Sequence, residues 1–97
     1  MTPEGRVKNE VKKILDTYKC WYFMPVSNGM GRHGIPDFIV CHAGYFVAIE
    51  TKANGGTPTA LQDRELQRIR MTGGVAIVIN ENNVQDLPNI LLHKAAS

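Results

Sequence analysis

The sequence predicts a single α/β domain in which helices flank a mixed β-sheet. Three observations support this prediction. An amphipathic helix opens the chain, two apolar β-favouring runs form a hairpin near its middle, and a second helix leads into a five-residue apolar strand. The resulting order, α-β-β-β-α-β-α, is typical of a mixed sheet between helices. A chain of 97 residues is long enough for one domain, spanning 1–97, with a modest core.

The first helix is expected over residues 3–18. Thr2 supplies an N-cap hydroxyl, Pro3 suits the first turn, and Glu4 lies near the positive end of the helix dipole. Apolar residues then recur at helical spacing, at Val7, Val11, Ile14, Leu15 and Tyr18. Residues 21–24 are expected to form a short strand, and a glycine-rich loop follows it.

Two apolar runs flank Ala43-Gly44 and predict a β-hairpin. With these two residues as the loop, Asp37 lies directly across from Glu50. Lys52 shares the face of both carboxylates, because side chains alternate with period two. A three-residue loop or a bulge would instead move Asp37 away from Glu50.

The paired carboxylates indicate a chemistry. Directly opposed residues have Cβ atoms about 4.5–5.5 Å apart, so two carboxylates there repel unless a cation or a proton lies between them. A divalent metal with oxygen ligands suits this arrangement, and a neighbouring lysine suits phosphate chemistry. The hairpin end is therefore a candidate metal-dependent phosphodiesterase site. The alternative is a solvated, charged end of a surface hairpin.

The second half of the chain supplies the remaining elements. A second helix is expected to open at Thr57-Pro58-Thr59 and run to about Met71, where Gly73-Gly74 ends it. Residues 75–79 form a continuous apolar run, typical of a strand covered on both faces. Residues 83–94 are expected to form a short final helix.

Two polar residues fall on apolar helix stripes. Glu4 shares the stripe of Val7 and Val11, which points it toward the sheet, whereas Glu10 lies about 80° from the stripe centre. Glu4 either completes the metal environment or only stabilises the helix dipole. Gln62 falls on the inward stripe of the second helix, where it either orients a water, phosphate or metal ligand or caps a strand end.

Composition excludes several classes of protein. The apolar fraction of 43% is ordinary, no apolar run approaches the roughly 20 residues of a membrane span, and the first residues do not resemble a secretory leader, so we expect a cytoplasmic protein. Cys20 and Cys41 are expected to be reduced core residues. The three histidines lack zinc-like spacing, and His33 is either a phosphate contact or a solvated loop residue.

The ordered motifs resemble a known family. Gly34-Ile35-Pro36-Asp37 followed by Glu50-Thr51-Lys52 resembles the PD-(D/E)xK nuclease signature. The upstream Thr2-Pro3-Glu4-Gly5 and the downstream Gln62 resemble its VRR-NUC branch. The resemblance runs from Glu4 to about Ile79 and implies a restriction-endonuclease-like αβββαβ core.

The resemblance also implies roles for these residues. Asp37 and Glu50 would coordinate Mg²⁺ or Mn²⁺ together with the Thr51 backbone carbonyl, and Glu4 would complete the metal environment. Lys52 would hold or polarise the attacking water, and Gln62 would support the site from the second helix.

Standalone members of this branch, often encoded by phages, look like homodimeric, structure-selective DNA nucleases that can act on branched DNA such as four-way (Holliday) junctions, and the resemblance implies the same activity for this chain. For a phage-encoded chain, the host cytoplasm would be the expected location. The alternatives are a catalytically silent nucleic-acid-binding module of the same fold and a structural or partner-binding domain. Several basic side chains are candidates for contacts with the DNA backbone: Arg6, Lys8, Lys12, Arg32, Arg64 and Arg68. A homodimer interface is expected at two apolar segments, Trp21-Tyr22-Phe23 and Ile90-Leu91-Leu92, unless these residues belong to the core.

Overall fold

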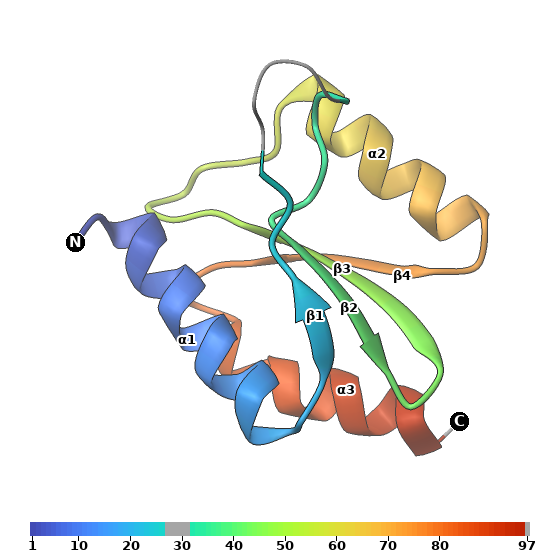
Figure 1. The fold of residues 1–97 in the computed structure, drawn as a ribbon. Helices are drawn as coiled ribbons and strands as arrows, with labels where there is room; N and C mark the ends of the chain where they lie inside the picture. The colour runs from blue at the N-terminus through green and yellow to red at the C-terminus, as the bar shows by residue number, and fades with distance from the viewer. Residues whose placement is uncertain (27–31, 97) are drawn as a thin grey trace.

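The computed structural model describes residues 1–26 and 32–96 (Figure 1). Its elements follow the predicted order: α1 (Pro3–Thr17), β1 (Trp21–Phe23), β2 (Phe38–His42), β3 (Tyr45–Thr51), α2 (Ala60–Met71), β4 (Val75–Ile79), a 3₁₀ turn η1 (Val84–Asp86) and α3 (Leu87–Ala96). Most of the glycine-rich loop expected before the hairpin, residues 27–31, lies outside the described residues. Within the described part, no helix is long and apolar enough to cross a membrane.

The four strands form one mixed sheet in the order β1-β2-β3-β4, which confirms the predicted fold class. The first three strands are antiparallel, and β4 runs parallel to β3. Parallel strands need a crossover connection, and α2 supplies it. In Figure 1, α1 and α3 lie on one side of the sheet and α2 lies on the other.

The hairpin of β2 and β3 has the predicted register, with His42 opposite Tyr45. The loop residues Ala43 and Gly44 have φ angles of 51° and 83°. Positive φ at both central residues is what a type I′ turn requires, and that turn matches the twist of the flanking strands. The turn therefore fixes the register that brings Asp37, at the entrance of β2, beside the end of β3.

The side of the sheet under α1 and α3 holds the main core. Its members alternate along the strands and recur along the helices, as the sequence pattern predicts. The buried residues of this core are Val7, Val11, Leu15, Phe38, Val40, Val47, Ile49, Ile79, Leu87 and Leu91.

The side under α2 is covered less completely. Leu66 packs on Ala48 and Ala76 there, with Ile39 and Ile69 partly buried around them. Helices lie on both faces of β4 as expected, but because β4 is an edge strand three of its five residues stay half-buried. The expectation that Cys41 belongs to the core is wrong: it is exposed, because α2 does not extend over this part of the sheet, whereas Cys20 is half-buried.

The outer edge of β4 is closed by side chains. Arg70 donates from Nε and Nη2 to the Ala76 carbonyl at 3.0 and 2.7 Å. Asn83 donates from Nδ2 to the Val78 carbonyl at 2.9 Å. These bonds occupy the outward carbonyls of an apolar edge strand, which would otherwise pair with another chain.

Candidate active site

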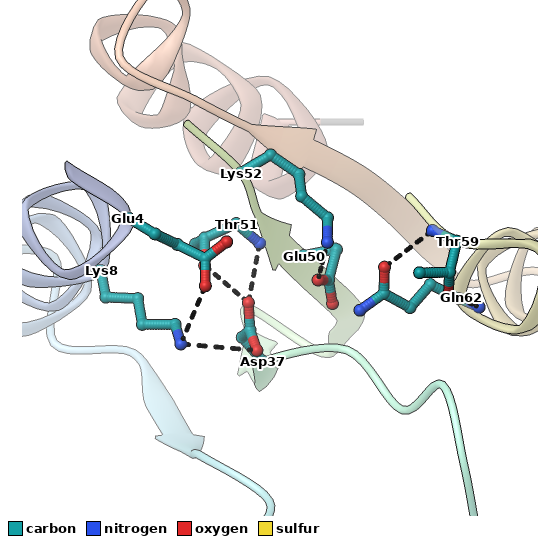
Figure 2. Close-up of polar contacts among 8 residues, drawn as sticks. All are labelled: Glu4, Lys8, Asp37, Glu50, Thr51, Lys52, Thr59 and Gln62. Carbon is teal, nitrogen blue, oxygen red and sulfur yellow. Dashed lines mark hydrogen bonds and ion pairs between the residues drawn. The ribbon is translucent and has the colours of Figure 1, made fainter. Parts of the chain in front are cut away.

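Asp37 is held in place by Thr51 at the end of β3. Its Oδ2 accepts hydrogen bonds from the Thr51 backbone N–H at 2.9 Å and from the Thr51 hydroxyl at 2.6 Å. Both partners donate to the same oxygen, so together they fix the orientation of the Asp37 carboxylate. Thr51 is fully buried, so Asp37 is anchored to a rigid part of the sheet (Figure 2).

Gly34 brings the segment before Asp37 against the start of α2. Its φ is 81°, and a Cβ at this position would lie 2.6 Å from the Leu61 carbonyl oxygen. Any side chain at residue 34 would therefore both strain the backbone and collide with the helix. The glycine of the Gly-x-Pro-Asp motif thus has a structural reason, which is the close approach of two backbones.

Glu50 is the buried carboxylate of the site. Only 2% of the residue is exposed. Its Oε2 lies 3.5 Å from Lys52 Nζ, and its Oε1 is buried without a hydrogen-bond partner among the described residues. Burial, and next the negative charge of Asp37, raise the pKa of Glu50 to about 7 against the opposing effect of Lys52. An unpartnered buried carboxylate oxygen is costly, and a bound cation would satisfy it.

The N-terminal part of α1 adds a second pair of charges. Lys8 Nζ lies 3.5 Å from Glu4 and 3.9 Å from Asp37, so it bridges the helix and the hairpin (Figure 2). The Glu4 side chain is 43% exposed. Glu4 was expected to point toward the core and the sheet. It lies on the side of α1 that faces the hairpin, but in this first turn it contacts Lys8 and not apolar residues.

From the sequence, Lys8 was expected only to contact the DNA backbone, and its place in the site was not predicted. The signal was available, since residues four apart on a helix are neighbours and Lys8 is four residues after Glu4. Glu10, the other candidate helix carboxylate, pairs with Lys13 at 3.5 Å. It also lines a different hollow, with Arg6 and Glu81. The structure therefore brings Glu4, and not Glu10, to Asp37.

Gln62 caps the start of its own helix α2 and not the end of a strand, and its expected role of orienting a water, phosphate or metal ligand stays a prediction. Its Oε1 accepts from the Thr59 N–H at 2.9 Å, and the Thr59 hydroxyl accepts from the Gln62 N–H at 3.2 Å, which forms a capping box at the start of α2. This bond fixes the orientation of the amide. Its nitrogen then points toward the Glu50 carboxylate (Figure 2).

A comparison with solved structures identifies the fold. A structure described as "VRR_NUC domain" aligns with 92% of this chain and 97% of its own chain, with a TM-score of 0.80 and 27% sequence identity. The chain has the VRR-NUC family fold. No family model and no curated protein matches the sequence. Because the alignment spans almost all of both chains, the likeness supports a nuclease-type domain.

The VRR-NUC fold suggests use of a divalent metal, and the residues present fit such an ion. Asp37 and Glu50 offer hard oxygen atoms, and the buried Oε1 of Glu50 has no hydrogen-bond partner within the described part of the chain. In the described part of the chain, however, no three Asp, Glu, His or Cys side chains gather closely enough to hold a metal by themselves. The two carboxylates would therefore need further ligands from the backbone, water or substrate, and Thr51 as a carbonyl ligand stays a prediction.

Proposed function

We propose that this chain is a divalent-metal-dependent endonuclease that hydrolyses phosphodiester bonds in branched DNA such as four-way (Holliday) junctions. The observation that carries the proposal is the buried Glu50, one oxygen of which has no hydrogen-bond partner among residues 1–26 and 32–96, beside Asp37 and Lys52 in a VRR-NUC fold. The alternative interpretation, in which the charged hairpin end is only solvated surface, would not bury a carboxylate in this way.

The site is accessible to a polymer. A hollow of about 360 Å³ is lined by Asp37, Gln62, Arg32 and His33. It lies at the end of the hairpin, so a phosphate can reach Asp37 from solvent. The nearby basic side chains would neutralise phosphate charge without reading base sequence.

The residues divide the work of hydrolysis. Asp37 and Glu50 would hold Mg²⁺ or Mn²⁺, with Glu4 close by in the first turn of α1. When bound, the metal lowers the pKa of water and binds a non-bridging phosphate oxygen. Lys52, 3.5 Å from Glu50, would orient the attacking water and donate to the phosphate as negative charge develops. Water adds across one P–O bond, leaving a phosphate on one fragment and a hydroxyl on the other.

Lys8 is the residue that the geometry adds to this scheme. Its ammonium partly neutralises Glu4 and Asp37. The Lys8 side chain is 32% exposed, so it would also be able to contact a phosphate of the substrate. Thr51 would keep Asp37 oriented throughout through its two hydrogen bonds.

The proposal includes a homodimer. A four-way junction presents two equivalent scissile strands, and one domain carries one site, so paired cuts need two subunits related by a two-fold axis. Of the apolar residues considered for the interface in α3, Leu92 is exposed and Leu91 belongs to the core. Tyr22 is half-buried on the core side, where its hydroxyl donates to Asp16 at 2.8 Å. Light scattering that gave a monomer mass with junction cutting intact would remove the dimer.

The test is a cleavage assay on labelled four-way junction, flap, duplex and single strand, with Mn²⁺, with Mg²⁺ and with EDTA. We expect metal-dependent cutting of branched DNA that Asp37→Asn and Glu50→Gln each reduce by at least about 10³-fold. Glu81→Gln, which alters an acid outside the site, is the matched control. DNA binding without cutting by the wild-type protein would favour the catalytically silent module instead, and wild-type rates in Glu50→Gln would contradict the site.

A further inference from the structure

The face of the sheet that carries Glu50 continues into an uncovered apolar surface. Side chains on one face alternate along a strand, so Phe46 and Glu50 share a face of β3. Strand pairing places two rows of residues from β1, β2 and β3 on this same face. The first row is Trp21, Cys41 and Phe46, and the next row is Phe23, Ile39 and Ala48. The described helices leave the β1 and β2 part of this face open.

Three aromatic side chains dominate this open surface. Trp21, Phe23 and Phe46 are 64%, 47% and 45% exposed. We call these three residues the aromatic shelf. The Trp21 and Phe23 rings meet edge to face with centroids 5.8 Å apart, so they are mutually ordered although exposed.

Two arginines are fixed beside α2. Glu65, which is 4% exposed, accepts from Arg32 Nε at 2.7 Å, and its other oxygen lies 3.5 Å from Arg64 Nε. Both arginine side chains are more than half exposed. A buried carboxylate thus holds two guanidinium groups at the surface with a net positive charge. We call Arg32 and Arg64 the arginine clamp.

Arg32, one of the two clamp residues, connects the candidate active site to the shelf. Arg32 lines the hollow of about 360 Å³ that contains Asp37. It also lines a second hollow of about 330 Å³ that contains Phe46 and Arg68. Ile35 and Pro36 line both hollows as well, so the two are neighbours. A linear polymer bound at Asp37 could therefore run past Arg32 to Phe46.

We propose that this surface binds single-stranded DNA, with phosphates on the arginine clamp and Arg68 and unpaired bases stacked on the aromatic shelf. The proposal rests on the proposed nuclease function and narrows its substrate to branched DNA with an unpaired arm next to the scissile bond. A guanidinium group can form two parallel hydrogen bonds to a phosphate, and an exposed aromatic ring can stack on any base. Basic side chains beside a ring surface complement a polyanion with flat bases.

A second copy of the chain fits this surface less well. Three rings of about 150–250 Å² each, about half exposed, offer on the order of 300 Å², whereas a stable interface needs about 800 Å² from each partner. A partner that extended beyond the shelf toward α2 would have to cover the exposed positive charge of the arginine clamp.

The shelf carries its own reporter, since Trp21 is the only tryptophan of the sequence. Titration of the wild-type protein in EDTA with a short oligo-dT should quench Trp21 emission to saturation, because a stacked base lies against the indole. A blunt duplex of equal charge should quench far less, because its bases are not available to stack. Absence of quenching by oligo-dT would overturn the proposal.

Variants separate stacking from charge. Phe46→Ala and Trp21→Ala should each weaken binding of fluorescein-labelled oligo-dT about 5- to 50-fold in anisotropy titrations, and Phe46→Tyr should retain it. Arg64→Ala should reduce the slope of log affinity against log salt by about 0.7, as expected for one lost phosphate contact. Met71→Ala, which truncates an exposed apolar residue at the end of α2, is the matched control and should bind as the wild type.

The outcomes distinguish this proposal from the nuclease proposal. Binding in EDTA does not depend on cutting, so a chain that binds oligo-dT through the shelf but never cuts DNA would overturn only the nuclease function. A chain that cuts junctions while Phe46→Ala and Trp21→Ala bind oligo-dT like the wild type would overturn only the single-strand surface. Sedimentation showing a wild-type dimer that Trp21→Ala splits, with oligo-dT binding unchanged, would assign the shelf to a second copy and contradict the proposal.

Discussion

The two faces of the sheet differ in how completely the helices cover them. Under α1 and α3, Phe38, Val40, Val47 and Ile49 are at most 1% exposed. On the opposite face, α2 shelters Ala48 and Ala76, while the aromatic shelf stays exposed and Glu50 carries an unpartnered oxygen at the end of β3. The first face supplies most of the stability of the fold. The second face carries exposed aromatic rings and a buried carboxylate, which do not stabilise the fold but are available to bind a ligand.

The largest expected difference is in the free energy of unfolding when one phenylalanine on each face of the sheet is truncated to alanine. Phe38→Ala, at a fully buried position of the α1 and α3 side, should lower the free energy of unfolding by about 3–5 kcal/mol. Phe46→Ala, at a half-exposed position of the open side, should cost less than about 1.5 kcal/mol. Urea unfolding followed by circular dichroism measures both. Equal losses would mean that the open face also holds the fold together.

A smaller effect concerns the pH dependence of stability in EDTA. The folded-state pKa of Glu50 is raised from 4.5 to about 7, so the folded protein binds this proton more tightly than the unfolded chain does. The resulting stability is fully present below pH 4.5 and is lost as the pH rises through about 7. Glu50→Gln should therefore be more stable than the wild type at pH 8, by about 1–2 kcal/mol, and should lack this part of the profile. Identical profiles for the two proteins between pH 5 and 8 would contradict the burial argument.

The smallest effect separates the two helix acids. Glu4→Gln should slow DNA cleavage about tenfold, because Glu4 meets Lys8 and Asp37 at the site. Glu10→Gln should leave the rate unchanged, since Glu10 pairs with Lys13. Single-turnover cleavage of a four-way junction gives both rates. A larger loss in Glu10→Gln would mean that α1 presents a different face to the substrate.

The sequence predicted most of the fold, because its local signals agree with one another. The caps at Thr2 and Thr59, the Ala43-Gly44 turn and the apolar periods all specify elements that the structure contains. The open face could not be predicted in the same way. Ile39, Cys41 and Phe46 are as apolar as the residues of the core face, and only the position and length of α2 leave part of them uncovered.

The candidate site was predictable where it depends on strand register and less so where it depends on distance between elements. The hairpin register predicted Asp37 directly across from Glu50. The strands pair in that register as far as Phe38 and Ile49, and the Asp37 carboxylate then bonds Thr51, the residue after Glu50. The contact of Lys8 with Asp37 joins residues 29 positions apart, and helix periodicity says nothing about how α1 meets the hairpin. The ion pair between Arg32 and Glu65 was missed for the same reason, since the two residues are 33 positions apart in the sequence.

The central claim is that Asp37 and Glu50 form a divalent-cation site that Lys52 serves without being a ligand. Calorimetric titration of Mn²⁺ into the wild type, Glu50→Gln and Lys52→Ala tests it most directly, with junction cleavage measured on the same samples. We expect the wild type and Lys52→Ala to bind Mn²⁺ with similar affinity, Glu50→Gln not to bind it, and both variants to lose most of their activity. Equal Mn²⁺ binding by the wild type and Glu50→Gln would contradict the claim.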